Sequence, residues 1–358
     1  MDALRLDAVH AILDHSPRPF LEELATAVHE LSTVINRPVY LMPESAANDS
    51  RLIRSRALGG YGLDAVWSDD FHHALRTRLT GEHDGYYEDY GKFKHLVHAY
   101  REGFAYSGEY SRFRKRRHGS SAKDIPSERF IVFCQNHDQV GNRPRGDRLT
   151  QSVCFEALKL AAATVILSPY IPLIFMGEEY GETAPFAYFI SHSDAELIEA
   201  VRRGRREEFA AFQWQGEIPD PQDDATFSQA KLHHEARQSG RHKVLEEFYK
   251  ELLRLRKAAP ALADLNKESM NVIGYENEQV LFAHRWSGAA HAIVIESFGR
   301  AEASIALPIP AGHWHKALDS TDEKWAGSGS AVPDELQSAG TITLALAPQS
   351  AVVFTVTN

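Results

Sequence analysis

Five short apolar runs in the first half of the chain end in polar residues, and most are followed by a segment whose apolar positions have helical spacing. Short runs rich in β-branched and aromatic residues predict buried strands, and a stripe repeating every three to four residues predicts a covering helix. The predicted strands are residues 3–9, 37–42, 63–67, 130–134 and 171–176, and the predicted helices are 17–31, 71–79, 92–104, 150–167, 193–209 and 243–259. The first helix is expected to bury Phe20, Leu21, Leu24, Val28 and Leu31.

Alternation of strands and helices indicates a parallel sheet of the (β/α)8 kind, but five strands are too few to close a barrel. We therefore expect an α/β fold in which residues 1–262 hold the C-terminal five strands of a TIM barrel, with the first three absent. From residue 271 onward, short runs are separated by Gly, Pro and Ser clusters, which predicts a small antiparallel, β-sandwich-like domain over residues 268–358. Its predicted strands are residues 271–275, 280–285, 292–297, 303–307, 315–318, 341–346 and 351–356.

Carboxylates stand at the carboxyl ends of three predicted strands. Asp7 belongs to the first strand, where Arg5 shares its face and can keep it ionised. Glu44 follows the second strand, and Asp138 follows the fourth, within the sequence QNHD. Each of them alone could be a helix cap, a turn residue or a surface ion pair. The repetition favours a catalytic site, because the active sites of barrels lie at this face.

Neither the histidines nor the cysteines predict a metal site. His72 and His73 are neighbours, and adjacent helical residues point about 100° apart, so both cannot face one ion. Cys134 and Cys154 lie outside any CxxC spacing and indicate neither zinc nor a disulfide framework. We expect no metal, no cofactor and a reducing cytoplasmic setting.

Composition limits the partners. A formal net charge of −10 speaks against a nucleic acid. The basic run at residues 112–117 lies among Gly, Ser and Tyr, and we interpret it as a solvated loop. No apolar run approaches the ~20 residues of a membrane span. The 358 residues, 43% of them hydrophobic, predict one large and one small globular domain.

Several motifs resemble the α-amylase superfamily of glycoside hydrolases and, within it, the maltooligosyltrehalose trehalohydrolase family. LRLDAVH is similar to the superfamily's nucleophile motif, PES to its general-acid motif and QNHD to its third-carboxylate motif. Longer stretches extend the resemblance over nearly the whole chain, namely VYLMPESAANDSRL, DAVWSDDFHHALR, FCQNHDQVGNRPRGDR and PLIFMGEEYGETAPFAYFISH.

This resemblance implies a retaining glycosidase in which Asp7 is the nucleophile, Glu44 the acid/base and Asp138 the third catalytic carboxylate. The implied substrate is a maltooligosyl trehalose or a related α-glucan, cleaved at the α-1,4 bond next to the terminal trehalose unit. Further residues are implied to bind the substrate, namely Arg5, His10, Asp70, Asn136 and His137.

The chain departs from the family in what it lacks: an N-terminal β-sandwich, the first three barrel strands and the family's first motif. We therefore expect that it is not an independent enzyme and that the missing N-terminal half acts with it as a separate chain. Two alternatives stay open. One is another superfamily enzyme such as a glucan branching enzyme, separable by its product. The other is a non-catalytic glucan-binding or complementing partner, separable by the upstream coding sequence.

Overall fold

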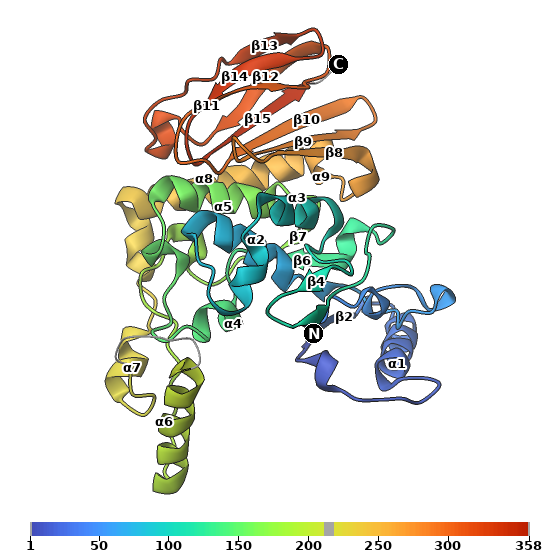
Figure 1. The fold of residues 1–358 in the computed structure, drawn as a ribbon, viewed down its shortest axis with the longest axis vertical. Coiled ribbons are helices and arrows are strands. Elements are labelled where there is room, and N and C mark those ends of the chain that lie inside the picture. The colour runs from blue at the N-terminus through green and yellow to red at the C-terminus, as the bar shows by residue number, and fades with distance from the viewer. Residues whose placement is uncertain (1, 211–217, 357–358) are drawn as a thin grey trace.

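The computed structural model describes residues 2–210 and 218–356. Figure 1 shows a β domain at one end, a layer of helices beneath it and, beyond this layer, the short strands that hold the predicted site. Helices α6 and α7 extend from the end opposite the β domain. The described part of the chain holds no helix of the length and apolar character needed to cross a membrane.

The short strands are parallel and neighbour one another in chain order. β1 (Ala3–Leu6) pairs with β2 (Tyr40–Pro43), with Arg5 opposite Met42. β3 (Val66–Trp67), β6 (Phe130–Val132) and β7 (Ile171–Pro172) form a second group. The Asp64 amide donates to the Leu41 carbonyl at 3.0 Å and joins the two groups. Their carboxyl ends therefore lie along one edge, as the alternating pattern predicts.

Helices separate most of these strands, and α2 shows how a polar cap and a glycine bound such a helix. α2 begins after Ser68, whose hydroxyl accepts from the Phe71 amide at 3.4 Å, and ends at Gly81, whose φ of 79° few other residues adopt. The helices are α1 (Phe20–Val34), α2 (Asp69–Thr80), α3 (Phe93–Glu102), α4 (His137–Gly141), α5 (Phe155–Ile166), α6 (Ala195–Ala210), α7 (Asp224–Gln229), α8 (Gly240–Ala258) and α9 (Pro260–Ala263).

The C-terminal part is antiparallel and has two sheets with a hydrophobic core between them. Six strands run in the order β13-β12-β15-β10-β9-β8, and β11 pairs with β14 in the second sheet. The strands are β8 (Met270–Tyr275), β9 (Val280–Ser287), β10 (Ala290–Ser297), β11 (Ala303–Leu307), β12 (Gly312–Asp319), β13 (Glu335–Ser338), β14 (Ile342–Leu346) and β15 (Ser350–Val356).

The other face of the six-stranded sheet packs on the helical layer, and a single core joins the two parts. Two buried cations hold this junction. Lys159 of α5 donates to the Ser320 carbonyl at 2.5 Å, and Arg285 of β9 donates to the Leu167 carbonyl at 2.8 Å. A buried cation is costly unless carbonyls replace its water, so these contacts fix how the β domain sits on the helices.

Three expectations from the sequence differ from the structure. The first strand ends at Leu6 rather than at residue 9, because Ala8 adopts a left-handed conformation (φ 42°) that turns the chain. Strand β13 and the hairpin of β4 (Tyr110–Ser111) and β5 (Arg116–Arg117) were not predicted, because they are too short or too polar to show a pattern. Finally, Phe20 and Leu31 of α1 are about half exposed rather than buried.

Candidate active site

The predicted nucleophile follows the end of β1 directly. The backbone amide of Glu44 donates to the Leu6 carbonyl at 2.8 Å, and the Val9 amide donates to the Glu44 carbonyl at 3.1 Å. The Ala8 amide donates to the Glu44 carboxylate at 2.8 Å. These bonds tie the turn after β1 to the end of β2, so Asp7 and Glu44 project from adjacent strand ends.

Arg5 brings the three predicted carboxylates together. One guanidinium nitrogen contacts Asp7, and the other lies 3.0 Å from Asp138 Oδ2 and 3.9 Å from Glu44 Oε2. The Arg5 guanidinium also lies 4.9 Å from the centre of the Trp67 ring at the end of β3, a cation–π contact. Residues up to 133 positions apart in the sequence therefore meet around one cation.

The three carboxylates differ in exposure, and this difference matches different tasks. The side chains of Asp7, Asp138 and Glu44 are 77%, 41% and 14% exposed. An open carboxylate can reach an atom of a bound substrate, whereas an enclosed carboxyl group is shielded from bulk water. The arrangement can therefore perform acid-base and nucleophilic chemistry on one bound molecule.

The predicted substrate-binding residues fall into two groups. His137 lies beside the site, with Nε2 3.3 Å from Asp138 Oδ2 and its ring edge-on to Trp67 at 5.9 Å. Asn136 is buried and caps α4 by accepting from the Gln139 amide at 2.7 Å. His10 is exposed on the short 3₁₀ helix after Asp7. Arg5 and His137 thus lie among the carboxylates, while the Asn136 side chain accepts a backbone hydrogen bond at the start of α4.

Asp70 is not brought into this group. It is buried, and its carboxylate accepts from Asn48 at 2.6 Å and from the Ala105 and Tyr106 amides at 2.9 Å each. The Tyr90 hydroxyl also donates to it. These donors satisfy the hydrogen-bonding capacity of the Asp70 carboxylate. Asp70 therefore anchors the loop after α3 to the start of α2. The substrate-binding role that the resemblance implied for Asp70 stays a prediction.

Its neighbour Asp69 lies near Glu44 and Asp138 instead. Gln139 donates to Asp69 Oδ1 at 3.3 Å, directly beyond Asp138 in the chain. Burial, with the negative charge of Glu44 next in importance, raises the pKa of Asp69 to about 7. A carboxyl group that titrates near neutrality beside other carboxylates is a candidate functional group. Its signal in the sequence was its place directly after a strand end.

No metal centre accompanies this site in the described residues, where no cluster of three or more His, Cys, Asp or Glu side chains is placed to hold an ion. The neighbouring His72 is instead a buried structural residue. Its Nδ1 lies 2.8 Å from the Cys134 carbonyl, its Nε2 lies 3.1 Å from the Tyr87 hydroxyl, and burial lowers its pKa to about 3.

Comparison with known proteins gives consistent relatives, although no family model matches the chain. The malto-oligosyltrehalose trehalohydrolase of Saccharolobus solfataricus is 47% identical over 257 residues, which are 72% of this chain and 43% of that protein. The protein of the same name from Arthrobacter ramosus is 48% identical over 72% of this chain and 45% of its own length. The protein of this name from Mycobacterium tuberculosis is 43% identical over 78% of this chain and 48% of its own length.

Solved structures agree with this relationship. A crystal structure of an α-amylase family protein from Salmonella typhimurium superposes with a TM-score of 0.83 at 32% identity, over all of this chain and 57% of that one. The α-amylase of H. orenii shares the fold at a TM-score of 0.57 and 16% identity. The chain spans about half the length of the curated relatives it matches. It belongs to the malto-oligosyltrehalose trehalohydrolase family of α-amylase-type proteins.

Proposed function

We propose that this chain carries the catalytic carboxylates of a retaining glycoside hydrolase that cleaves the α-1,4 bond next to the terminal trehalose of a maltooligosyl trehalose. The observation that carries the proposal is the convergence of Asp7, Glu44 and Asp138 on Arg5 at adjacent strand ends. The name that the relatives share, malto-oligosyltrehalose trehalohydrolase, supports the release of trehalose.

The chemistry proceeds in two steps. Asp7 attacks the anomeric carbon, the bond to the leaving oxygen breaks, and Glu44 gives that oxygen its proton, which frees trehalose. Glu44 then takes a proton from water as the water attacks the same carbon, and the bond to Asp7 breaks. Asp138, with Arg5 and His137, is proposed to bind the sugar and to stabilise the positive charge that develops on it.

We also propose that a second polypeptide segment completes the site. The side of β1 away from β2 has no partner strand among the described residues. Beside it, α1 presents a stripe of helical spacing to solvent in which Leu31 is 51% and Val34 is 82% exposed. Exposed apolar stripes of this kind mark protein contacts. The segment that fits would add parallel strands to β1 and lay a helix on α1.

The other end of the strand group fits the same interpretation. Among the residues that the structure describes, β7 pairs with one strand only, β6. Met176, five residues beyond the first residue of β7, is half exposed. Two open edges of parallel strands frame one gap, which three further strands would close into a barrel. We propose that the completing segment is the part of the family's sequence that this chain does not span, either in the same polypeptide or as a separate chain.

Reconstitution tests both proposals. The chain is assayed for trehalose release from maltooligosyl trehalose alone and after co-expression with the part of a curated relative that lies outside the aligned region. We expect activity only in the combination. Asp7→Asn should lower its turnover by several orders of magnitude while substrate still binds. Asp2→Asn, an equal change at an exposed aspartate of the same segment, is the control.

Four outcomes would contradict the proposals. Retention of more than about a tenth of the turnover in Asp7→Asn would remove the nucleophile assignment. A branched glucan in place of free trehalose would favour a branching enzyme. Full activity of the chain alone would show that no second segment is needed. A stable complex that binds glucan without turnover would contradict the catalytic role.

A further inference from the structure

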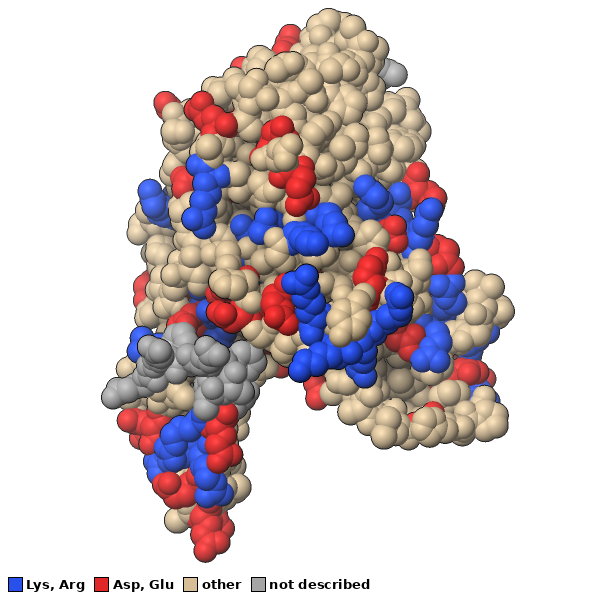
Figure 2. Space-filling view, in the orientation of Figure 1, with Lys and Arg blue, Asp and Glu red and all other residues tan. Residues whose placement is uncertain are grey.

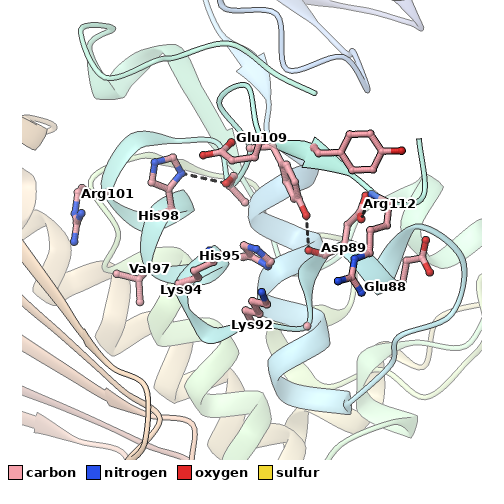
Figure 3. A pocket seen from close by; sticks show the side chains of 14 residues that line it. Glu88, Asp89, Lys92, Lys94, His95, Val97, His98, Arg101, Glu109 and Arg112 are labelled. Carbon is pink, nitrogen blue, oxygen red and sulfur yellow. Dashed lines mark hydrogen bonds between the residues drawn. The ribbon is translucent and has the colours of Figure 1, made fainter. Parts of the chain in front are cut away.

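A cavity of about 760 Å³ lies on the outer side of α3, and no residue of the carboxylate cluster lines it. Its walls are one side of α3 along its length, the 3₁₀ helix before it, and the segment that leads into and begins the β4–β5 hairpin (Figure 3). The volume is in the range of pockets that hold small organic molecules. The lining is polar and charged, which is unlike an apolar packing defect.

Three of the cations that line this cavity have no ion-pair partner among the described residues: Lys92, Lys94 and Arg112. Figure 2 shows Lys and Arg side chains gathered on this face, over the region where Figure 1 places α3 and β4. The whole chain has a net charge of −10, so this concentration of basic side chains does not follow from composition. Clustered cations repel one another unless an anion lies between them.

The cavity also has carboxylates, but two of the three already have donors. Asp89 accepts from the Arg112 amide at 2.8 Å and from the Ser111 hydroxyl, and so closes the hairpin loop. Glu109 accepts from the Ser107 amide at 2.6 Å. Glu88 remains beside the cavity. The charged groups are therefore close to balanced in number, whereas the unused hydrogen-bonding groups are mainly donors.

The start of α3 adds to this excess of donors. Lys92 is its N-cap residue, Lys94 lies in the first turn, and that turn has no acidic residue. The amino end of a helix favours negative charge, so lysines there are unfavourable without a bound anion. Glu276 accepts from the Phe93 amide at 3.3 Å on one side of this turn. On the cavity side, the Nδ1 atom of His95 is buried without a hydrogen-bond partner among the described residues.

We propose that this cavity binds a sugar-sized phosphate monoester. The phosphate group would lie between Lys92, Lys94 and Arg112, because a dianion with three free oxygens suits several separate donors. The cavity is much larger than one phosphate group, and its aromatic and imidazole side chains, Tyr106, Tyr110, His95 and His98, offer ring faces and hydrogen bonds for the rest of the ligand. The site is separate from the hydrolytic site and does not depend on its assignment.

Isothermal titration of the purified chain tests the site with glucose 6-phosphate, inorganic phosphate and glucose as probes. We expect glucose 6-phosphate to bind most tightly, inorganic phosphate more weakly and glucose not measurably, with affinity falling as salt is added. The double variant Lys92→Gln/Lys94→Gln should raise the Kd at least about tenfold. The control is Lys243→Gln/Lys257→Gln, which removes the same charge from two exposed lysines of α8 and should change the Kd less than about twofold.

Several results would overturn the proposal. Equal loss of affinity in both double variants would show general attraction to positive charge rather than a site. Equal affinity for glucose would remove the role of the phosphate, and equal affinity for inorganic phosphate would remove the role of the sugar. The absence of any heat of binding at millimolar glucose 6-phosphate, in a chain whose circular dichroism spectrum shows that it is folded, would show that the cavity does not bind this ligand.

Discussion

Glu296 is a buried carboxyl group at the junction between the β domain and the helices. It lies in β10, opposite Leu281 on one side and Ala351 on the other, and neither of its oxygens has a hydrogen-bond partner among the described residues. The nearby Thr164 hydroxyl donates to the Leu160 carbonyl at 2.8 Å. Burial raises the pKa of Glu296 from 4.5 to about 8, although Thr164 acts in the opposite direction.

This shift has a defined sign and size. The unfolded chain releases the Glu296 proton near pH 4.5, whereas the folded chain keeps it until about pH 8. The free energy of unfolding is therefore highest below pH 4.5 and falls as the pH rises through 8, because only the unfolded chain gains from ionisation in this window. At about 1.4 kcal/mol per pH unit between 4.5 and about 8, the loss reaches roughly 5 kcal/mol.

Replacing Glu296 by Gln keeps the size of the side chain and removes the ionisation. Glu296→Gln should therefore lie within about 1 kcal/mol of the parent at pH 5 and exceed it by roughly 4 to 5 kcal/mol at pH 8.5. Urea unfolding followed by tryptophan fluorescence at both pH values measures this difference. Glu302→Gln, at an exposed glutamate of the same domain, should show no such change. A gain for Glu296→Gln that is the same at both pH values would refute the reasoning.

Four further predictions concern the site and its completion. The first three are measured on the reconstituted enzyme and the fourth on the chain alone. Glu44→Gln should slow the natural substrate far more than an activated aryl glycoside, because a good leaving group needs no proton; equal losses would argue against the acid role. Asp69→Asn should change the pH–rate profile near neutrality, because Asp69 is the group whose pKa burial raises to about 7; an unchanged profile would leave Asp69 without this effect. Arg5→Lys should reduce turnover at least about tenfold, since a lysine cannot span two carboxylates; near-parental turnover would remove Arg5 as the organising residue. The chain alone should self-associate as its concentration rises, and Leu31→Ser/Val34→Ser should weaken this association; a parent that stays monomeric by ultracentrifugation would contradict the proposed contact surface.

Much of the architecture around the site was predictable from local sequence. Five parallel strands in chain order, helices between most of them and a C-terminal antiparallel domain all follow from runs and periods that are visible over five to fifteen residues. Such patterns reflect local burial and backbone preference, which act whatever lies elsewhere in the chain. The division into residues 1–262 and 268–358 stays a prediction, because one core joins the two parts.

The carboxylates themselves were also predictable, because side chains beyond the ends of parallel strands share one edge of the sheet. What the sequence left open was which of two neighbours faces that edge. Asp69 and Asp70 both follow β3, and adjacent helical residues point about 100° apart. The packing of Phe71 and Leu75 in the core sets the rotation of α2, and it directs Asp70 into the loop contacts and Asp69 toward Glu44.

The sequence by itself predicted the candidate carboxylates, since Asp7, Glu44 and Asp138 stand at or just beyond the ends of predicted strands. Only the tertiary structure decided that Arg5 is the group on which they converge and that Trp67 supports it, because such contacts join residues far apart in the chain. It likewise decided which apolar side chains are buried. Phe20 and Leu31 have the periodicity of core residues, but periodicity shows only that a face is apolar. Whether that face is covered depends on what packs against it, and within the described residues nothing covers this part of α1.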